Sequence, residues 1–359
     1  MSTLSEATLH LGRLDGIAAR VPNPDLFVAM YVRQEAVLSS QIEGTQASLT
    51  EVLQFEAGMD GDARVKDAAE VSNYVRAMNM GLERLATLPL SKRLVREIHC
   101  TLLENSRGTL LTPGEFRTSQ NWIGAPGCVL TTARFVPPPP RILHDVLDAW
   151  ERFLHDESFP PLIQAALAHA QFETIHPFLD GNGRIGRLLI TFLLCTRGVL
   201  KRPLLYLSAY LKRNRAEYYD RLQAVRENGH WEQWVRFFLR GVAEVAKDAT
   251  ATADRVLDLQ RELHQKVLED KRGPNLLKTL DHLFLHPAIT VAQLQSALAV
   301  STPTANSLMS RCVELGILHE ITGHKRNRWF HFVPFLELFE SASTTRLPEP
   351  PAAATRRDG

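Results

Sequence analysis

The residues best suited to chemistry stand together in one segment, His176 to Arg187, which reads HPFLDGNGRIGR. It holds a histidine, an acid, an amide, two arginines and three glycines, and it ends where an apolar helical run, residues 188–195, begins. Glycines let backbone N–H groups approach a ligand, and the start of a helix offers unpaired N–H groups and a positive dipole end to an anion. Arg184 and Arg187 are three residues apart, so both guanidinium groups can face one ligand. The segment therefore predicts a phosphate site beside a histidine base.

Other sites built from the same residue types fit this segment less well. The glycines match GxGxxG, but a dinucleotide site needs a preceding strand and an acid about 20 residues later. Residues 162–174 read as a helix instead, and residues 201–203 are basic. The chain has no GxxxxGK[ST] loop, and the ExxH pair Glu173 and His176 lacks the second pair that a di-iron site needs. The remaining alternative is a glycine-rich corner in which His176 only caps the preceding helix.

The segment resembles the signature of the Fic family, HPFx(D/E)GNGRxxR, at every fixed position. The resemblance extends through residues 114–117, 135–138 and 165–176 and covers about two thirds of the chain. It implies a mainly α-helical Fic-type bundle with a small β-hairpin flap. It also implies an adenylyltransferase, which moves AMP from ATP to Ser, Thr or Tyr hydroxyls of target proteins and of itself.

The resemblance also implies a role for each signature residue. His176 would take the proton of the attacking hydroxyl. Asp180 would help to hold Mg²⁺ against the α- and β-phosphates of ATP. The phosphates would be bound by Gly181, Asn182, Gly183, Arg184 and Arg187, with Asn182 and Arg184 gripping them directly.

A second, shorter motif lies at the end of an N-terminal helix predicted over residues 22–44. Glu43 falls in its last turn, where a carboxylate faces the negative end of the helix dipole and needs a cation. The segment from Ser39 to Gly44 is similar to (S/T)xxxE(G/N), the inhibitory motif of Fic proteins. By that resemblance Ser39 and Glu43 belong to an inhibitory helix, and Glu43 pairs with Arg187. The alternative is a capping box of Ser40 with Glu43 that opens a new helix.

Between the two motifs, helical periodicity predicts core helices over residues 67–85 and 91–105. Residues 121–136 predict a short hairpin around a turn at 125–127, whose edge could pair with a target peptide. Fic proteins are similar in having such a flap beside the motif, and an ordinary surface hairpin is the alternative. Further helices are predicted over 161–174, where His169 reads as a core histidine, and over 212–228. On the last one an adenine wall could be formed by Tyr218, Tyr219 and Leu222, although aromatic stripes more often belong to a core.

The C-terminal third reads as a separate module. A helix over 231–246 closes the Fic-like part, and a linker helix follows over 250–271. Helical runs at 276–285, 291–298 and 302–315 and strand-like runs at 317–321 and 329–332 resemble a winged helix. Lys325, Arg326 and Arg328 would meet DNA phosphates from the wing, but the recognition helix has only Arg311 as a cation, so a protein-docking or dimerising module remains open. The predicted domains are 1–65, 66–246, 247–273 (linker) and 274–340, with a disordered tail over 341–359.

Composition sets the remaining limits. The chain has 359 residues, with 41 Lys and Arg against 40 Asp and Glu, so its charge predicts no general attraction to nucleic acid or membranes. Its four cysteines form no CxxC pair, and it has no signal peptide or apolar run of 18 residues. We therefore expect a soluble, cytoplasmic protein without a membrane partner. The alternatives to AMP transfer are a DNA-binding regulator whose Fic domain senses nucleotide, and a Fic enzyme that removes AMP with Glu43 orienting a water.

Overall fold

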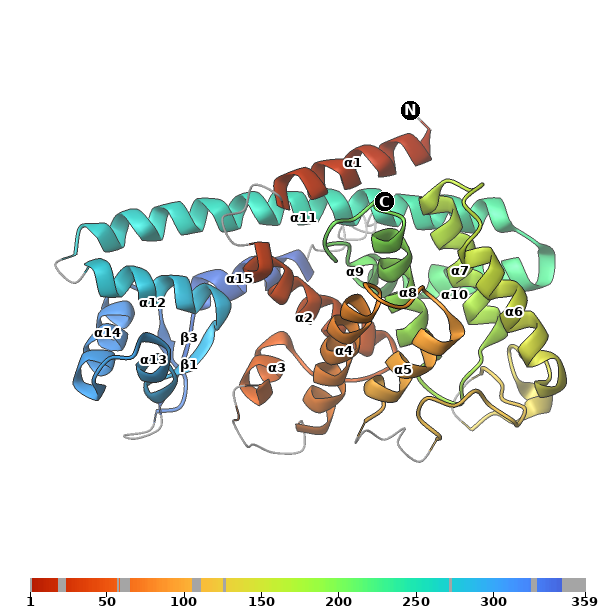
Figure 1. The fold of residues 1–359 in the computed structure, drawn as a ribbon, viewed down its shortest axis with the longest axis horizontal. Coiled ribbons are helices and arrows are strands. Elements are labelled where there is room, and N and C mark those ends of the chain that lie inside the picture. The colour runs from red at the N-terminus through yellow and green to blue at the C-terminus, as the bar shows by residue number, and fades with distance from the viewer. Residues whose placement is uncertain are drawn as a thin grey trace, which may run out of the picture. The chain divides into compact units, whose positions relative to one another are not determined.

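The structure is a computed structural model that describes residues 2–18, 24–56, 58, 65–104, 111–124, 127–270, 273–323 and 328–343 (Figure 1). Residue contacts divide the chain into two units, residues 1–254 and 255–359. The boundary falls within the long helix α11 (Trp231–Leu268). No helix in the described ranges is both long and apolar enough to span a membrane.

The first unit is built from helices around α8 (Asn182–Thr196), which is buried along most of its length and packs against α2, α4, α5 and α7. The helices before it are α1 (Thr3–Ala18), α2 (Pro24–Ile42), α3 (Leu49–Glu56), α4 (Val65–Arg84), α5 (Lys92–Leu102), α6 (Leu143–Leu154) and α7 (Pro161–Ile175). Those after it are α9 (Leu207–Arg213), α10 (Arg215–Asn228) and α11. Small residues permit the close α7–α8 contact: a Cβ added to Gly186 of α8 would lie 2.7 Å from a Glu173 carboxylate oxygen.

The helices predicted around the signature are confirmed to within a few residues, but three others differ from expectation. The helix predicted over 212–228 is α10, which begins at Arg215, because Asn214 separates it from α9. The two helices predicted over 231–271 are one, because residues 242–268 contain no glycine or proline to interrupt it. The helices α1 and α3 were not predicted.

In the part of the flap between α5 and α6 that the structure describes, one antiparallel bridge joins the two sides. Ile123 and Phe135 exchange both backbone hydrogen bonds, at 2.8 and 3.0 Å. A 3-10 turn, η2 (Leu130–Thr132), lies between them, and residues 125–126 are outside the described part of the chain. The predicted hairpin is therefore present in its shortest form.

The second unit combines helices with a three-stranded antiparallel sheet of order β1-β3-β2. Its elements are α12 (Gly273–Leu285), β1 (Ala288–Thr290), α13 (Val291–Leu298), α14 (Thr302–Glu314), β2 (His319–Glu320), β3 (Trp329–His331) and α15 (Val333–Ser343). Strand β3 pairs with both neighbours, so that His331 faces Ala288 and His319. The helices and the β2–β3 pair were predicted, whereas β1 and α15 were not. The predicted tail was wrong at its start, because residues 341–343 end α15, whose Phe335 and Phe339 are buried; residues 344–359 are outside the described residues.

Candidate active site

The backbone at His176 is held in an unusual conformation by residues from the flap. His176 follows the last residue of α7 with φ of 50° and ψ of 60°. This left-handed conformation is unfavourable for any residue that has a Cβ atom. The His176 carbonyl accepts hydrogen bonds from Nε of Arg117 at 2.9 Å and from Nδ2 of Asn121 at 3.3 Å. The buried Arg117 guanidinium also donates to the carbonyls of Ile175 and Pro138. Arg117 therefore joins the flap to the end of α7 and fixes the direction in which His176 leaves the helix.

The His176 side chain, by contrast, has a ring nitrogen that makes no hydrogen bond within the described structure. The ring is half-buried, and this nitrogen is Nδ1. Burial lowers the pKa of His176 and raises the pKa of the neighbouring Glu173, whose Oε1 is also unpartnered. A lowered pKa keeps the imidazole neutral at neutral pH, which is the form that can accept a proton.

The loop after His176 is fixed by two side chains that bind its backbone. The buried Asn182 amide accepts from the Phe178 N–H at 2.9 Å and donates to the Phe178 carbonyl at 2.8 Å. Its prediction as a side chain that grips phosphate is thus not supported, because both ends of the amide are already used. Only the backbone N–H of Asn182, in the first turn of α8, remains suited to an anion.

His99 of α5 supports the same loop from the other side. Its Nδ1 accepts from the Gly114 N–H at 2.8 Å, so Nε2 carries the proton that it donates to the Asp180 carbonyl 3.0 Å away. The ring stacks on Phe178 with centroids 3.7 Å apart. Burial lowers the pKa of His99 to about 4, which keeps this tautomer neutral. His99 was missed because no spacing relates it to the signature.

The first turn of α8 is already occupied by a carboxylate. Gly181 is the N-cap, with φ of 77°, and α8 begins directly after it. A Cβ added to Gly183 would lie 2.2 Å from Oε1 of Glu43, so that carboxylate rests against the Gly183 backbone. Glu43 therefore lies at the helix end whose dipole and N–H groups favour anions.

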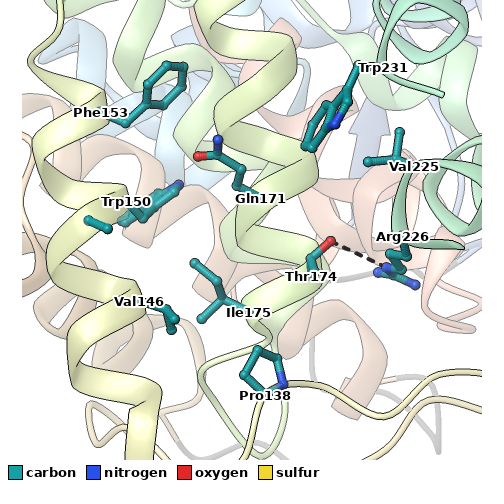
Figure 2. Close-up of a pocket in the computed structure, with 11 residues that line it drawn as sticks. Pro138, Val146, Trp150, Phe153, Gln171, Thr174, Ile175, Val225, Arg226 and Trp231 are labelled. Carbon is teal, nitrogen blue, oxygen red and sulfur yellow. Dashed lines mark hydrogen bonds between the residues drawn. The ribbon is translucent and has the colours of Figure 1, made fainter. Parts of the chain in front are cut away.

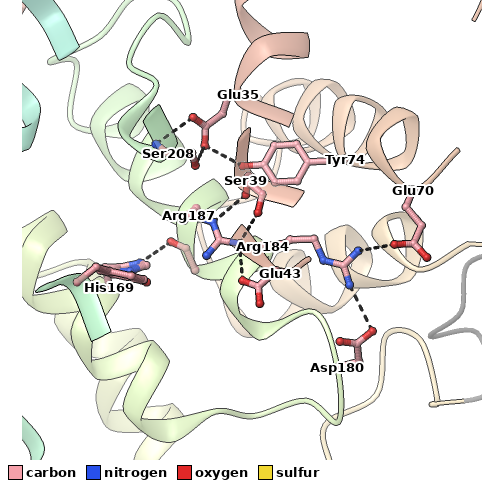
Figure 3. Close-up of polar contacts among 12 residues, drawn as sticks. Glu35, Ser39, Glu43, Glu70, Tyr74, His169, Asp180, Arg184, Arg187 and Ser208 are labelled. Carbon is pink, nitrogen blue, oxygen red and sulfur yellow. Dashed lines mark hydrogen bonds and ion pairs between the residues drawn. The ribbon is translucent and has the colours of Figure 1, made fainter. Parts of the chain in front are cut away.

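Arg187 is bound to the end of α2 through three hydrogen bonds (Figure 3). Its Nη2 donates to Oε1 of Glu43 at 2.6 Å and to the Ser39 carbonyl at 3.0 Å, while Nε donates to Oγ of Ser39 at 2.7 Å. Burial would raise the pKa of Glu43, but the charge and hydrogen bond of Arg187 outweigh it and lower the pKa overall. The predicted ion pair is present. The capping-box alternative is not, since Oγ of Ser40 has no partner among the described residues.

Arg184 is held far more loosely than Arg187 and points to a different side. Its guanidinium lies 3.3 Å from Asp180 and 3.9 Å from Glu70, and its Nε is unpartnered within the described structure. The expectation that both arginines face one ligand is therefore not met in this state, because Arg187 is turned toward α2.

Asp180 was predicted to hold Mg²⁺. Within the described residues no group of three or more His, Cys, Asp or Glu side chains could hold a metal. Mg²⁺, however, commonly takes one or two carboxylates together with substrate phosphates and waters. The Asp180 side chain is 42% exposed and lies beside the first turn of α8, so it fits that role as a single protein ligand.

The predicted adenine wall is largely part of the core. Tyr218 and Leu222 are each 1% exposed, and the Tyr218 hydroxyl donates to Nε2 of His169 at 2.9 Å. Nδ1 of His169 in turn donates to the Gly186 carbonyl at 2.9 Å, and burial lowers the pKa of His169 to about 4. Tyr218 and Leu222 therefore pack against α7 and not a ligand, whereas Tyr219 is half-buried. The interpretation of His169 as a core histidine is confirmed.

A largely apolar groove of about 480 Å³ lies beside the end of α7 (Figure 2). Its walls include Trp150 and Phe153 of α6, Ile175 of α7 and Trp231 of α11. At its rim the Arg226 guanidinium lies 4.0 Å from the centre of the Phe135 ring and donates to the Glu173 carbonyl at 2.9 Å. Arg226 thus connects α10 to both the flap and α7.

Two family descriptions match the chain: "Fic/DOC family N-terminal" over residues 1–83 and "Fic/DOC family" over residues 89–194. The chain belongs to the Fic/DOC family. Similar proteins include the protein adenylyltransferase Fic of Drosophila grimshawi, 29% identical over 73% of this chain and 48% of that protein. The protein of the same name from Aedes aegypti is 30% identical over 61% of this chain and 39% of its own length. The chain thus spans about half or less of the length of these relatives.

Solved structures show the same fold. A Fic family protein from Desulfovibrio desulfuricans G20 superposes with a TM-score of 0.60 at 19% identity, over 92% of this chain and 96% of that one. Fic-1 from C. elegans gives a TM-score of 0.51 at 24% identity, over 72% of each chain. The Fic signature, His99 and Arg117 all lie within residues 89–194, and Glu43 lies within residues 1–83.

The C-terminal unit follows the predicted order of helices and strands, and its identity as a winged helix stays a prediction. Ser301 caps α14, and Arg311, the cation of that helix, pairs with Asp270 at 2.6 Å and with Glu314 at 2.7 Å. Lys325 and Arg326 are outside the described residues, and Arg328 lies over the Phe330 ring. Because Arg311 is already paired, α14 offers little charge to DNA phosphates.

Proposed function

We propose that the protein transfers AMP from ATP to a Ser, Thr or Tyr hydroxyl of a target protein, or of itself, and that its own Glu43 inhibits the transfer. The observation that carries the proposal is the position of the Glu43 carboxylate, against Gly183 and on Arg187. An anion already sits where the first turn of α8 favours a phosphate. The relatives' common name, protein adenylyltransferase, supports the same reaction.

The neutral His176 would act as the general base. It accepts the proton of the target hydroxyl as that oxygen attacks the α-phosphorus, and the bond from the α-phosphorus to the bridging oxygen breaks as pyrophosphate leaves. The flap contacts of Arg117 and Asn121 hold the His176 backbone while the proton moves. Base and target must be aligned to within a fraction of an ångström for such help to be effective.

The first turn of α8 would bind the phosphates through backbone N–H groups at Gly181, Asn182 and Gly183, with Arg184 neutralising charge. Mg²⁺ bound at Asp180 would supply further neutralisation of the phosphates. Arg184 is suited to this task because its present partners are distant, at 3.3 and 3.9 Å. Phosphoryl-type transfer depends mainly on such positioning and charge.

Glu43 would inhibit by taking the place of a phosphate. While Arg187 is bound to Glu43 and Ser39 it cannot receive the γ-phosphate. ATP would then bind with its α-phosphorus poorly aimed at the incoming hydroxyl. Withdrawal of Glu43 would free both Arg187 and the space above Gly183.

The test is to incubate the protein with Mg²⁺ and ATP labelled on the α-phosphate, alone and with cell lysate, and to follow label on protein. We expect protein-bound label from the α-phosphate and none from the γ-phosphate. Label from the γ-phosphate would mean kinase chemistry and would refute AMP transfer. Release of AMP from a labelled protein would support the alternative of AMP removal.

A further inference from the structure

The inhibitory helix carries a second carboxylate that neither motif includes. Glu35, Ser39 and Glu43 are spaced four residues apart, so they lie along one side of the C-terminal half of α2. Glu35 is 3% exposed, and its oxygens accept from the hydroxyl and the N–H of Ser208 and from the Tyr74 hydroxyl at 3.3 Å (Figure 3). Moving a carboxylate from water into the protein interior costs free energy, which its three hydrogen bonds only partly offset. The buried position of Glu35 therefore needs an explanation.

Hydrogen bonds hold two neighbouring turns of α2. Nε of Arg187 donates to Oγ of Ser39 at 2.7 Å. One turn earlier, the Tyr74 hydroxyl donates to Oε1 of Glu35 at 3.3 Å, and the hydroxyl and N–H of Ser208 donate to the same carboxylate. Glu35 and Ser39 are therefore held on one side of the same helix.

These contacts fix α2 against three neighbours at once. Tyr74 belongs to α4, Ser208 to α9 and Arg187 to α8, and all three helices pack on α2. The Glu43 end of α2 is held by Arg187 and by Gln41, whose Oε1 accepts from Nζ of Lys212 at 2.6 Å. Glu43 itself follows the last helical residue, and its side chain is 36% exposed. The contacts of Ser39 and Glu35 lie one and two turns before this carboxylate.

We propose that Glu35 is a positioning residue of the inhibitory contact: its hydrogen bonds with Tyr74 and Ser208 hold α2 in place and so keep Glu43 on Gly183 and Arg187. The inference rests on the proposed function, since it assigns a role within the same inhibition. Glu35 touches no reacting group, so its effect on AMP transfer passes entirely through Glu43.

Tyr74→Phe tests this with little damage to the core, because it keeps the ring and removes only the hydroxyl that joins α4 to Glu35. We expect the rate of AMP transfer to rise about 2- to 10-fold, the range that corresponds to one net hydrogen bond. Tyr206→Phe is the matched control: Tyr206 is also buried, but its hydroxyl has no partner within the described structure, so the rate should not change.

The same substitution in a Glu43→Gly protein separates positioning of Glu43 from other roles. With Glu43 gone, Tyr74→Phe should have no further effect. An equal change in both backgrounds would show a general structural role, and a loss of transfer in Glu43→Gly would show that Glu35 aligns Arg187 for catalysis. Either result, or no change in the unmutated background, overturns the proposal.

Failure of the proposed function would look different. If Glu43→Gly transfers AMP faster but Tyr74→Phe does not, only the role of Glu35 is wrong. If no variant transfers AMP, amide hydrogen exchange over residues 36–43 decides instead. Tyr74→Phe should then speed exchange there relative to Tyr206→Phe, and equal exchange would overturn the proposal.

Discussion

The two halves of the candidate site are held in opposite ways. At His176 the backbone is fixed by Arg117 and Asn121, while the imidazole Nδ1 and Oε1 of Glu173 have no partners within the described residues. At Arg187 the side chain itself is bound, by three hydrogen bonds of 2.6 to 3.0 Å to Ser39 and Glu43. In the mechanism that we propose, His176 is the base and Arg187 binds phosphate, so the base is free to act while the cation is engaged. The proposal therefore places the inhibition on the nucleotide side of the site.

The largest effect should come from the base itself. His176→Ala, made in the Glu43→Gly protein, should lower AMP transfer about 100- to 10,000-fold, because general-base help is of that size. ATP binding should persist, since the first turn of α8 is unchanged. Labelled AMP on protein and ATP affinity are the two measurements, with the exposed His155→Ala as control. Unchanged transfer would remove His176 from the mechanism.

A smaller effect should follow from loosening the backbone on the same side. Arg117→Lys keeps the charge but cannot reach the carbonyls of His176, Ile175 and Pro138 together. We expect kcat to fall about 10- to 100-fold, as for a base displaced by roughly 1 Å, with little change in KM for ATP. The exposed Arg93→Lys should change neither constant. A rise in KM with kcat unchanged would mean that Arg117 acts on nucleotide binding. That result would contradict the separation of the site into a His176 half and an Arg187 half.

The smallest effect should be a pH dependence of the inhibited side. Burial raises the pKa of Glu35 to about 7 from an ordinary 4.5, against the opposing effects of Ser208, Arg187 and Tyr74. A raised pKa means that proton binding favours the state in which Glu35 is buried. Inhibition should therefore weaken, and AMP transfer rise a few-fold, as pH increases through about 7.

The groups that face Glu35 determine how such a pH profile is assigned. These groups are Tyr74 from α4, Arg187 from α8, and Tyr206 and Ser208 at the start of α9. Arg33 of α2 is paired with Glu56 of α3 at 2.7 Å. Glu35→Gln should flatten the rise, because an amide does not titrate here. The same rise in that variant would assign the titration to another group.

Local sequence was enough to predict the compact parts of the site. The signature from His176 to Arg187 spans one turn and one helix start, so residue spacing alone indicated an anion site beside a base. The pair of Glu43 with Arg187 joins residues far apart in sequence, and it could be predicted only because a family resemblance linked the two motifs. The structure then added the distance, 2.6 Å, and the burial of Arg187.

Residues that act from a distance could not be predicted. His99 and Arg117 support the signature loop from α5 and the flap, and we propose that Glu35 and Tyr74 position Glu43. No periodicity relates these four residues to the signature. The prediction that Tyr218 and Leu222 form an adenine wall is not supported, for a related reason. An apolar stripe shows which side of a helix is buried but not whether a ligand or another helix covers it. The prediction of two separate helices over 231–271 was wrong because we interpreted the polar, threonine-containing stretch as a linker. No glycine or proline interrupts that stretch, and it continues the helix α11.

The central claim is that Glu43 holds Arg187 and keeps the phosphate site closed. The most direct measurement is the initial rate of AMP transfer from α-labelled ATP by the unmutated protein, by Glu43→Gly and by Glu43→Gly with Arg187→Ala. We predict a rise of about 10-fold or more in Glu43→Gly, as expected when one charge-assisted pair biases a two-state site, and loss of that gain in the double variant. Equal rates for the unmutated protein and Glu43→Gly, with ATP bound equally well by both, would contradict this claim.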